Sequence, residues 1–223
     1  MNPEELLKKG LNELGFSCSA EQVNAFIIYL SELKKWNRAY NLTGLKTDKD
    51  IIIKHFFDSL LYLKAMPARV KKIADIGSGA GFPGMPIKII KPELEMTLID
   101  SSRKKTAFLR HIIRVLRLTG ISVLNNRIET LGEDFEKVFD VIVSRAAFKI
   151  KDFHRKACPF IKDNGRLLLS TGPKVPAEIR ELKDKGIIEN ILKVPFTIET
   201  DATFFSAVRN LLVLKCRNKN TLL

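Results

Sequence analysis

Lys71-Lys-Ile-Ala-Asp-Ile-Gly-Ser-Gly-Ala-Gly-Phe-Pro-Gly84 is the segment around which we predict the fold to be organised. A short apolar run, Ile73 to Ile76, contains Asp75 and is followed by repeated glycines. An apolar patch from Ile87 to Ile90 then predicts the start of a helix. A strand, a glycine-rich turn and a helix in this order form the ligand-binding edge of many α/β sheets. Glycine suits the turn because its backbone bends tightly and a ligand can approach it without meeting a Cβ atom.

The glycine motif fits two classes of ligand. Gly79-x-Gly81-x-x-Gly84 matches the dinucleotide fingerprint. Asp75-x-Gly77-x-Gly79-x-Gly81 matches the first motif of methyltransferases that use S-adenosylmethionine. A glycine-rich turn without any ligand is a third possibility, because isolated glycine motifs are common. Other parts of the chain have to separate these three.

The composition is that of a globular protein without a membrane segment. The chain has 223 residues, of which 45% are hydrophobic, which suits one large domain or a domain with a small appendage. No apolar run reaches the roughly 20 residues of a membrane span. The first residues lack the apolar segment of a signal peptide. We therefore expect a cytoplasmic protein without a membrane partner.

The formal net charge of +13 favours a polyanionic partner. Phosphate contacts and counterion release drive the binding of basic proteins to nucleic acids. A basic surface kept for solubility is the alternative. Nothing in the sequence predicts an obligate protein partner.

The cysteines and histidines show no recognisable spacing. The cysteines are few, odd in number and far apart, and the histidines do not cluster: Cys18, Cys158, Cys216, His55, His111 and His154. We therefore expect neither a disulfide framework nor a protein-bound metal.

Residues 3 to 65 have a helical pattern. Leucines at helical spacing precede Gly15, which is expected to end the first helix. Ser19 precedes a long amphipathic stretch, and Asp48 is the expected N-cap of a third helix. We expect residues 1–66 to be a helical extension that caps the core or recruits a partner, and residues 67–223 to be the α/β domain.

From residue 70 onward, short apolar runs alternate with helical segments. Strands are predicted at 73–76, 96–99, 121–124, 138–143 and 166–169, and helices near 84–91, 102–118, 150–162 and 176–185. This alternation predicts a parallel, doubly wound sheet. Two late extended runs, 191–198 and 210–215, have no helix between them, so we expect an antiparallel pair at the sheet edge. The intervening 199–209 segment, with Phe204 and Phe205, is predicted to be a loop.

Asp100 ends the second strand, where a carboxylate can accept both hydroxyls of a ribose. Capping of the following helix is its alternative role. The ribose role suits either adenosine-containing ligand. Three other features favour S-adenosylmethionine: Asp75 stands where a dinucleotide site has an apolar residue, the chain is too short for a substrate domain, and the antiparallel ending suits a seven-stranded methyltransferase sheet.

Two further segments follow predicted strands. In Asn125-Asn-Arg-Ile-Glu129, Ile128 is expected to pack on an adenine ring while Glu129 or a backbone amide contacts its edge; a capped short helix is the alternative. In Ser144-Arg-Ala146, Arg145 is expected to bind the carboxylate of the cofactor or to orient a base or phosphate. A plain surface arginine is the alternative there.

Basic side chains gather on the predicted helix 102–118. Its candidates for RNA contact are Arg103, Lys104, Arg110, Arg114 and Arg117, and the basic tail from Lys215 to Lys219 has the same character. A solvated charged face is the common alternative. A hydrolase site made of His55, Asp58 and Ser59 is disfavoured, because the serine lacks a strand-to-helix elbow.

These motifs together resemble the family called glucose-inhibited division protein B, or ribosomal RNA small-subunit methyltransferase G. The resembling blocks occur in the family's order across the chain up to about residue 175. They are Lys35-Trp-Asn-Arg-Ala-Tyr-Asn-Leu-Thr43, His55-Phe-Phe-Asp-Ser59, Asp75 to Gly84 with its Phe-Pro-Gly ending, Asp100-Ser, Arg127-Ile-Glu129 and Ser144-Arg-Ala146.

The resemblance implies a Rossmann-like class I methyltransferase fold, with a seven-stranded, mostly parallel sheet behind a helical extension. It implies transfer of a methyl group from S-adenosylmethionine to N7 of guanine 527 in 16S ribosomal RNA, leaving S-adenosylhomocysteine. The small ribosomal subunit or an assembly intermediate would be the partner. By motif position the cofactor contacts would be Gly77, Phe82, Ile128, Glu129 and Arg145, to which the strand pattern adds Asp100.

The expected chemistry needs no catalytic acid, base or metal. Guanine N7 carries an exposed lone pair and no proton, so alignment and electrostatics would suffice. Two other functions remain open at this point. One is an RNA- or ribosome-binding protein with a vestigial nucleotide site, and the other is a nicotinamide-dependent oxidoreductase.

Overall fold

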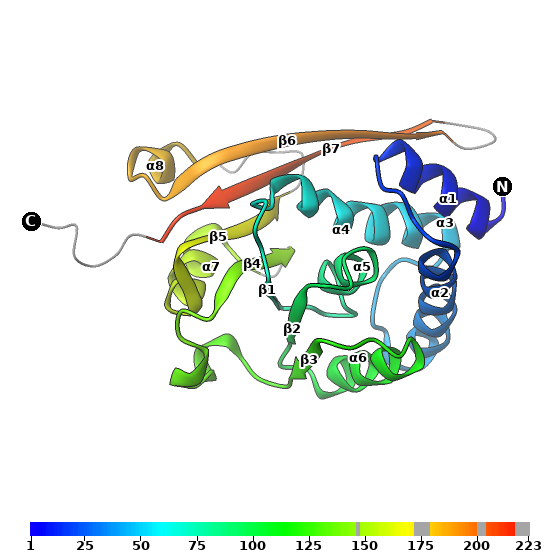
Figure 1. Ribbon diagram of the computed structural model, residues 1–223, viewed down its shortest axis with the longest axis horizontal. Coiled ribbons are helices and arrows are strands. Elements are labelled where there is room, and N and C mark those ends of the chain that lie inside the picture. The colour runs from blue at the N-terminus through cyan, green and yellow to red at the C-terminus, as the bar shows by residue number, and fades with distance from the viewer. Residues whose placement is uncertain (146–147, 172–178, 200–203, 217–223) are drawn as a thin grey trace, which may run out of the picture.

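The protein is built on one seven-stranded sheet with the order β3-β2-β1-β4-β5-β7-β6 (Figure 1). The computed structural model describes residues 1–145, 148–171, 179–199 and 204–216. The strands are β1 (Lys72–Ile76), β2 (Glu95–Ile99), β3 (Ile121–Leu124), β4 (Phe139–Arg145), β5 (Ile161–Thr171), β6 (Ile188–Glu199) and β7 (Phe204–Leu214). Strands β1 to β5 pair in parallel, whereas β7 is antiparallel to both β5 and β6. The predicted mostly parallel sheet with an antiparallel edge is confirmed.

The prediction of a loop at 199–209 is wrong in its second half. Strand β7 begins at Phe204, and the β6–β7 pairing runs from Ile188 opposite Leu214 to Glu199 opposite Phe204. Phe205 is partly buried and packs against Phe196, with ring centroids 5.7 Å apart. The strand positions alternate in exposure, but Val208 lies on the exposed side and Arg209 on the half-buried side, so the sequence lacks the apolar alternation of a strand.

Helices cover both faces of the sheet. Helices α5 (Gly84–Ile90) and α6 (Arg103–Val115) bury residues in one hydrophobic cluster, whereas α7 (Ile150–Ala157) and α8 (Ile179–Asp184) belong to a second cluster. Short 3-10 turns connect the elements at Ile128–Thr130, Glu133–Phe135 and Cys158–Phe160. The predicted 150–162 helix is therefore shorter than expected, since Pro159 lacks a backbone N–H and β5 begins at Ile161.

The N-terminal helices share the first cluster with the sheet. They are α1 (Pro3–Glu13), α2 (Ala20–Tyr40), α3 (Asp48–Ile51), a π-helical segment (Ile52–Phe57), α4 (Asp58–Leu60) and a 3-10 turn (Leu61–Ala65). Gly15 has a left-handed φ of 81° just after α1, and Ser19 caps α2 as expected. A domain boundary near residue 66 stays a prediction.

The predicted N-cap of the third helix is wrong by one residue. Thr47 has the extended backbone of an N-cap and its hydroxyl accepts the Asp50 amide at 3.1 Å, while Asp48 is already helical. Both residue types suit the position, so local sequence did not distinguish them.

Two tyrosine hydroxyls help to fasten these helices to the sheet and the glycine loop. The Tyr62 hydroxyl donates to the Ser144 carbonyl at 2.6 Å and accepts the Ser170 amide at 3.1 Å, at the ends of β4 and β5. The Tyr29 hydroxyl donates to the Ala80 carbonyl of the glycine loop at 2.5 Å. The extension therefore holds the edge of the sheet at which the parallel strands end. Within the described ranges no helix combines the length and apolar character that crossing a membrane requires.

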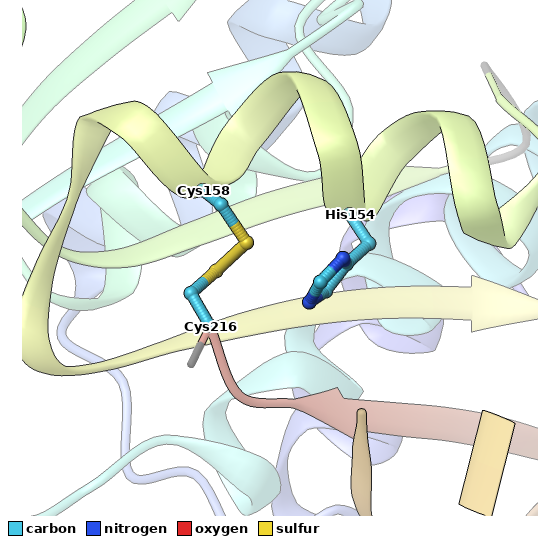
Figure 2. A group of neighbouring side chains, drawn as sticks. All are labelled: His154, Cys158 and Cys216. Atoms are coloured by element: carbon cyan, nitrogen blue, oxygen red, sulfur yellow. A yellow bond between two sulfur atoms is a disulfide. The ribbon is translucent and has the colours of Figure 1, made fainter. Parts of the chain in front are cut away.

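The expectation that the cysteines form no disulfide is wrong. Cys158 and Cys216 are bonded across a sequence separation of 58, with His154 beside them (Figure 2). The two residues meet because β7 returns next to β5 and ends beside the 3-10 turn that follows α7. Spacing alone does not reveal such a contact, because it depends on strand order. Cys18 is free.

Candidate functional site

The glycine loop leaves β1 and turns into α5 through left-handed backbone. Gly81 has φ 103°, and a Cβ atom there would lie 2.6 Å from the Tyr29 hydroxyl oxygen. A Cβ atom on Gly84 would lie 2.4 Å from Leu98 Cδ2 and 2.9 Å from Asp75 Oδ2. Glycine is therefore required at both positions, by conformation at the first and by close packing at the second.

Asp75 fastens this loop from within the core. Its side chain is fully buried, and Oδ2 accepts the Gly84 amide at 2.8 Å. Among the described residues Oδ1 has no hydrogen-bond partner. Burial raises the pKa of Asp75 to about 7, although the Gly84 amide and Arg145 act in the opposite direction. The motif acid therefore holds the loop shape and lies below the surface.

Asp100 lies at the end of β2 and is 8% exposed. Its Oδ2 accepts the Gly79 amide at 2.8 Å, and Oδ1 accepts the Ser102 amide at 2.8 Å. Each carboxylate oxygen can accept a further donor, because it has more than one lone pair. The carboxylate is thus fixed in position while it retains acceptor capacity toward a neighbouring pocket.

A pocket of about 450 Å³ opens where β1, β2 and β3 end. Four of the predicted residues line it: Gly77, Asp100, Ile128 and Glu129. Ile128 is buried and supplies an apolar wall. Glu129 is exposed and pairs with Lys156, and the hydrogen bond from Lys156 lowers the pKa of Glu129. The pocket thus combines an anchored carboxylate, an apolar surface and bare glycine backbone.

Two lining residues were missed by sequence reasoning. Phe148 follows β4 and Lys156 lies on α7, and the Lys156 ammonium stands 5.4 Å from the centre of the Phe148 ring. Neither belongs to a recognisable motif. Lys156 reaches the pocket because α7 packs against the Ile128–Thr130 turn, and Phe148 lies between β4 and α7. Of the Ser144-Arg-Ala146 block, Ala146 lies outside the described residues.

Phe82 and Arg145 do not line this pocket and form a second cluster instead. The Arg145 guanidinium lies 5.2 Å from the centre of the Phe82 ring. It donates to the Lys54 carbonyl at 3.1 Å, to Asp58 at 3.4 Å and to His55 Nδ1 at 2.8 Å. The His55 ring stacks on Phe82 with centroids 4.3 Å apart. The six predicted cofactor residues are therefore divided between two neighbouring places.

The second cluster fixes the protonation state of His55. Because Arg145 can only donate, Nδ1 of His55 must accept, and Nε2–H faces the Thr43 hydroxyl at 2.7 Å. Burial, followed by the charge of Arg145, lowers the pKa of His55 to about 3. Asp58 is 5% exposed and also pairs with Arg209 of β7. The cluster therefore holds a neutral imidazole beside two arginines that share one carboxylate.

The hydrolase arrangement is not formed. The Ser59 hydroxyl donates to the backbone carbonyl of His55 at 2.5 Å instead of to its ring. His55 and Asp58 had no assigned role beyond their motif, and their contacts with Arg145 come from elements that are distant in sequence.

The basic residues of α6 point away from the core. Four of the residues predicted to contact RNA are exposed on this helix: Arg103, Lys104, Arg110 and Arg114. The fifth, Arg117, is exposed in the turn after it with φ 50°, because α6 ends at Val115 and not at 118 as predicted. Phe108, Leu109 and Ile112 fill the opposite, buried side. None of the five lines the pocket, although Lys105 of the same helix does. Most of the basic tail, residues 217–219, lies outside the described part of the chain.

Comparison with known proteins identifies the relatives of this chain. A family described as rRNA small subunit methyltransferase G matches residues 22–203. A protein named ribosomal RNA small subunit methyltransferase G from Geobacter sp. (strain M21) is 44% identical over 184 residues, which cover 82% of this chain and 83% of the relative.

The chain belongs to the rRNA small subunit methyltransferase G family. The protein of that name from Mycoplasma capricolum is 37% identical over 212 residues. The aligned region covers 95% of this chain and 91% of the Mycoplasma protein. Membership in this methyltransferase family favours the methyltransferase interpretation of the glycine motif over the dinucleotide one.

Solved structures of other methyltransferases share the fold of this chain. A precorrin-6y C5,15-methyltransferase from Geobacter metallireducens has a TM-score of 0.54 at 14% identity, covering 80% of this chain and 92% of its own. A protein described as a putative RNA methyltransferase from Pyrococcus horikoshii has a TM-score of 0.53 at 14% identity. The match covers 85% of this chain and 96% of the Pyrococcus chain. The fold is the Rossmann-like class I methyltransferase fold.

Proposed function

We propose that this protein transfers the methyl group of S-adenosylmethionine to N7 of a guanine in 16S ribosomal RNA, with guanine 527 as the expected target. The observation that carries the proposal is the pocket at the strand ends, where a fixed carboxylate, an apolar wall and glycine backbone meet. Family membership supports the ribosomal RNA of the small subunit as substrate.

The residues of the pocket fit an adenosine group. Asp100 has spare acceptor capacity for ribose hydroxyls, and Ile128 offers an apolar surface to an adenine ring. Gly77 lets a ligand approach the backbone closely. Lys156 holds Glu129 at the rim, where its carboxylate can accept from the edge of a base.

The second cluster suits the other end of the cofactor and the target base. Arg145 would bind a carboxylate, and Phe82 would supply an aromatic wall beside it. When bound, S-adenosylmethionine supplies an electrophilic methyl group. Guanine N7 needs no proton removed, so the neutral state of His55 is compatible with the reaction. The residues of this chain would act by alignment and electrostatics.

Asp58 would reduce the repulsion between Arg145 and the positive charge that develops on the guanine ring. The guanine ring becomes positive on methylation, which an isolated arginine would oppose. Asp58 offsets part of the charge of Arg145 and Arg209. We therefore assign Asp58 and His55 the role of positioning residues that act through Arg145.

The test is methyl transfer to small ribosomal subunits that lack the modification, using a radiolabelled methyl donor and mapping the labelled nucleotide. Naked 16S RNA and complete subunits should be compared as substrates. We expect label at N7 of a single guanine. Salt-sensitive RNA binding without any transfer would overturn the proposal in favour of an RNA-binding protein with a vestigial site.

A further inference from the structure

Three side chains of types that can bind metals lie together at the end of α7, and none of them lines the pocket. His154 belongs to α7, Cys158 follows at its end, and Cys216 follows β7 (Figure 2). One ligand atom from each of the three residues lies within 4.8 Å of the others, and all three side chains are half-buried. A disulfide explains the nearness of the cysteines, but it needs no histidine beside them.

The spacing of two of the ligands is that of a helical metal site. His154 and Cys158 are four residues apart at the end of a helix, so their side chains lie on one face. Neighbouring ligands around a tetrahedral zinc ion lie about 3.8 Å apart, given bond lengths near 2.3 Å. In the disulfide form the two sulfurs are bonded to each other, and one ring nitrogen of His154 lies within 4.8 Å of both. Cleavage of the S–S bond and a small separation of the sulfurs would bring the three ligands to zinc spacing.

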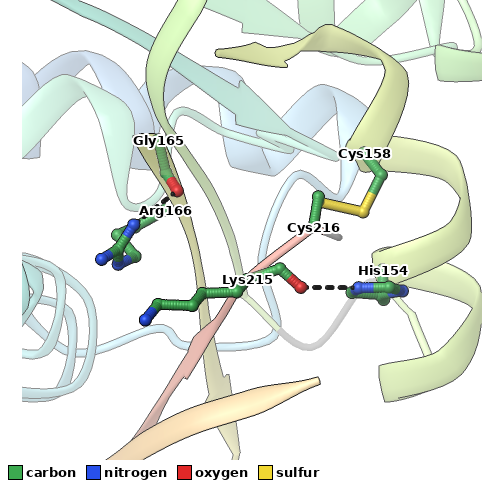
Figure 3. The surroundings of a disulfide bond; sticks show 6 residues. All are labelled: His154, Cys158, Gly165, Arg166, Lys215 and Cys216. Atoms are coloured by element: carbon green, nitrogen blue, oxygen red, sulfur yellow. Dashed lines mark hydrogen bonds between the residues drawn. A yellow bond between two sulfur atoms is a disulfide. The ribbon is translucent and has the colours of Figure 1, made fainter. Parts of the chain in front are cut away.

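The imidazole is prepared for coordination. Nε2 of His154 lies 2.9 Å from the Lys215 carbonyl, which can only accept, so Nε2 carries the proton and Nδ1 carries the lone pair (Figure 3). Histidines that bind metals commonly donate their other ring N–H to a backbone carbonyl in this way.

Nearby cations do not exclude a metal ion, because they have partners. Lys156 pairs with Glu129, Arg155 with Asp152 at 3.4 Å, and Lys215 with Glu189 at 2.7 Å.

We propose that, when reduced, Cys158, Cys216 and His154 form a binding site for a zinc-type divalent cation, and that metal and disulfide are mutually exclusive states of the site. A phosphine reductant breaks the S–S bond with two electrons. It becomes a phosphine oxide by taking the oxygen of one water, whose two protons go to the sulfurs. The ion then displaces both thiol protons and binds two thiolates and the imidazole. Water fills the fourth position of this half-buried site.

The test uses the full chain with Cys18→Ser, so that the unrelated thiol does not contribute. The protein is reduced with a phosphine, freed of reductant under anaerobic conditions and titrated with cobalt(II). We expect one equivalent to bind, with thiolate-to-cobalt absorption that zinc(II) abolishes. The oxidised protein should give no such band.

Three variants in that background locate the site. Cys158→Ser and Cys216→Ser should lose the thiolate absorption of a two-sulfur site, and His154→Ala should bind cobalt at least about tenfold more weakly. Circular dichroism before and after reduction checks that the chain stays folded. No cobalt–thiolate band in the reduced protein, equal binding by all variants, or unfolding on reduction alone would each overturn the proposal. None of these readouts depends on methyl transfer.

Discussion

At the scale of single residues, Asp100 is the sharpest test of the pocket. Asp100→Ala removes acceptors that would bond two ribose hydroxyls, so we expect affinity for S-adenosylhomocysteine to fall by about 1–3 kcal/mol. Isothermal titration calorimetry measures this. The matched control is Asp163→Ala, an exposed acid outside the pocket residues that pairs with Lys137. Unchanged affinity in Asp100→Ala would remove this residue from the site.

His55 of the π-helical segment and Asp75 of β1 make opposite contributions to stability as pH falls. His55 has its pKa lowered to about 3, so below pH 6.5 the unfolded chain binds more protons and the folded state loses stability. Asp75 has its pKa raised to about 7, so below that pH the folded chain binds more protons and gains stability.

A variant that lacks one of these groups should show the pH dependence of stability that the other group causes. Between pH 7 and pH 5 each contribution amounts to about 2 kcal/mol, because a tenfold change in a proton-binding constant corresponds to about 1.4 kcal/mol. Relative to the parent chain, His55→Gln should gain stability over this interval and Asp75→Asn should lose it. Urea unfolding at the two pH values measures the difference. Parallel changes in both variants would contradict these protonation states.

At the scale of elements, the exposed side of α6 carries the candidate RNA surface. Arg110→Gln with Arg114→Gln should weaken binding to 16S RNA and reduce the salt dependence of log K by about 0.7–0.9 for each phosphate that the variant no longer neutralises. The matched control is Lys8→Gln with Lys185→Gln, which removes two charges from α1 and the end of α8. Fluorescence anisotropy at several salt concentrations distinguishes them. Equal effects in both pairs would indicate that only net charge matters.

At the scale of the whole molecule, the disulfide ties the last described strand to the turn after α7. Closing a loop with a sequence separation of 58 limits the unfolded chain, and we expect reduction in the absence of metal to lower the free energy of unfolding by roughly 4 kcal/mol. Urea unfolding of oxidised and reduced Cys18→Ser measures this. Cys158→Ser in the same background should show no response to reductant, and a response there would contradict the assignment.

The parallel core, its order of strand and helix, and the glycine turn could be predicted from the sequence, because they depend on local hydrophobic period and backbone freedom. The sequence also supplied Asp100 and Ile128, since strand ends of a parallel sheet meet at one edge. Tertiary structure alone decided that Phe82 and Arg145 join His55 and Asp58, that Phe148 and Lys156 reach the pocket, and that Cys158 meets Cys216 beside His154. Each of these contacts joins elements that only strand order and helix packing bring together, and no local pattern encodes that arrangement.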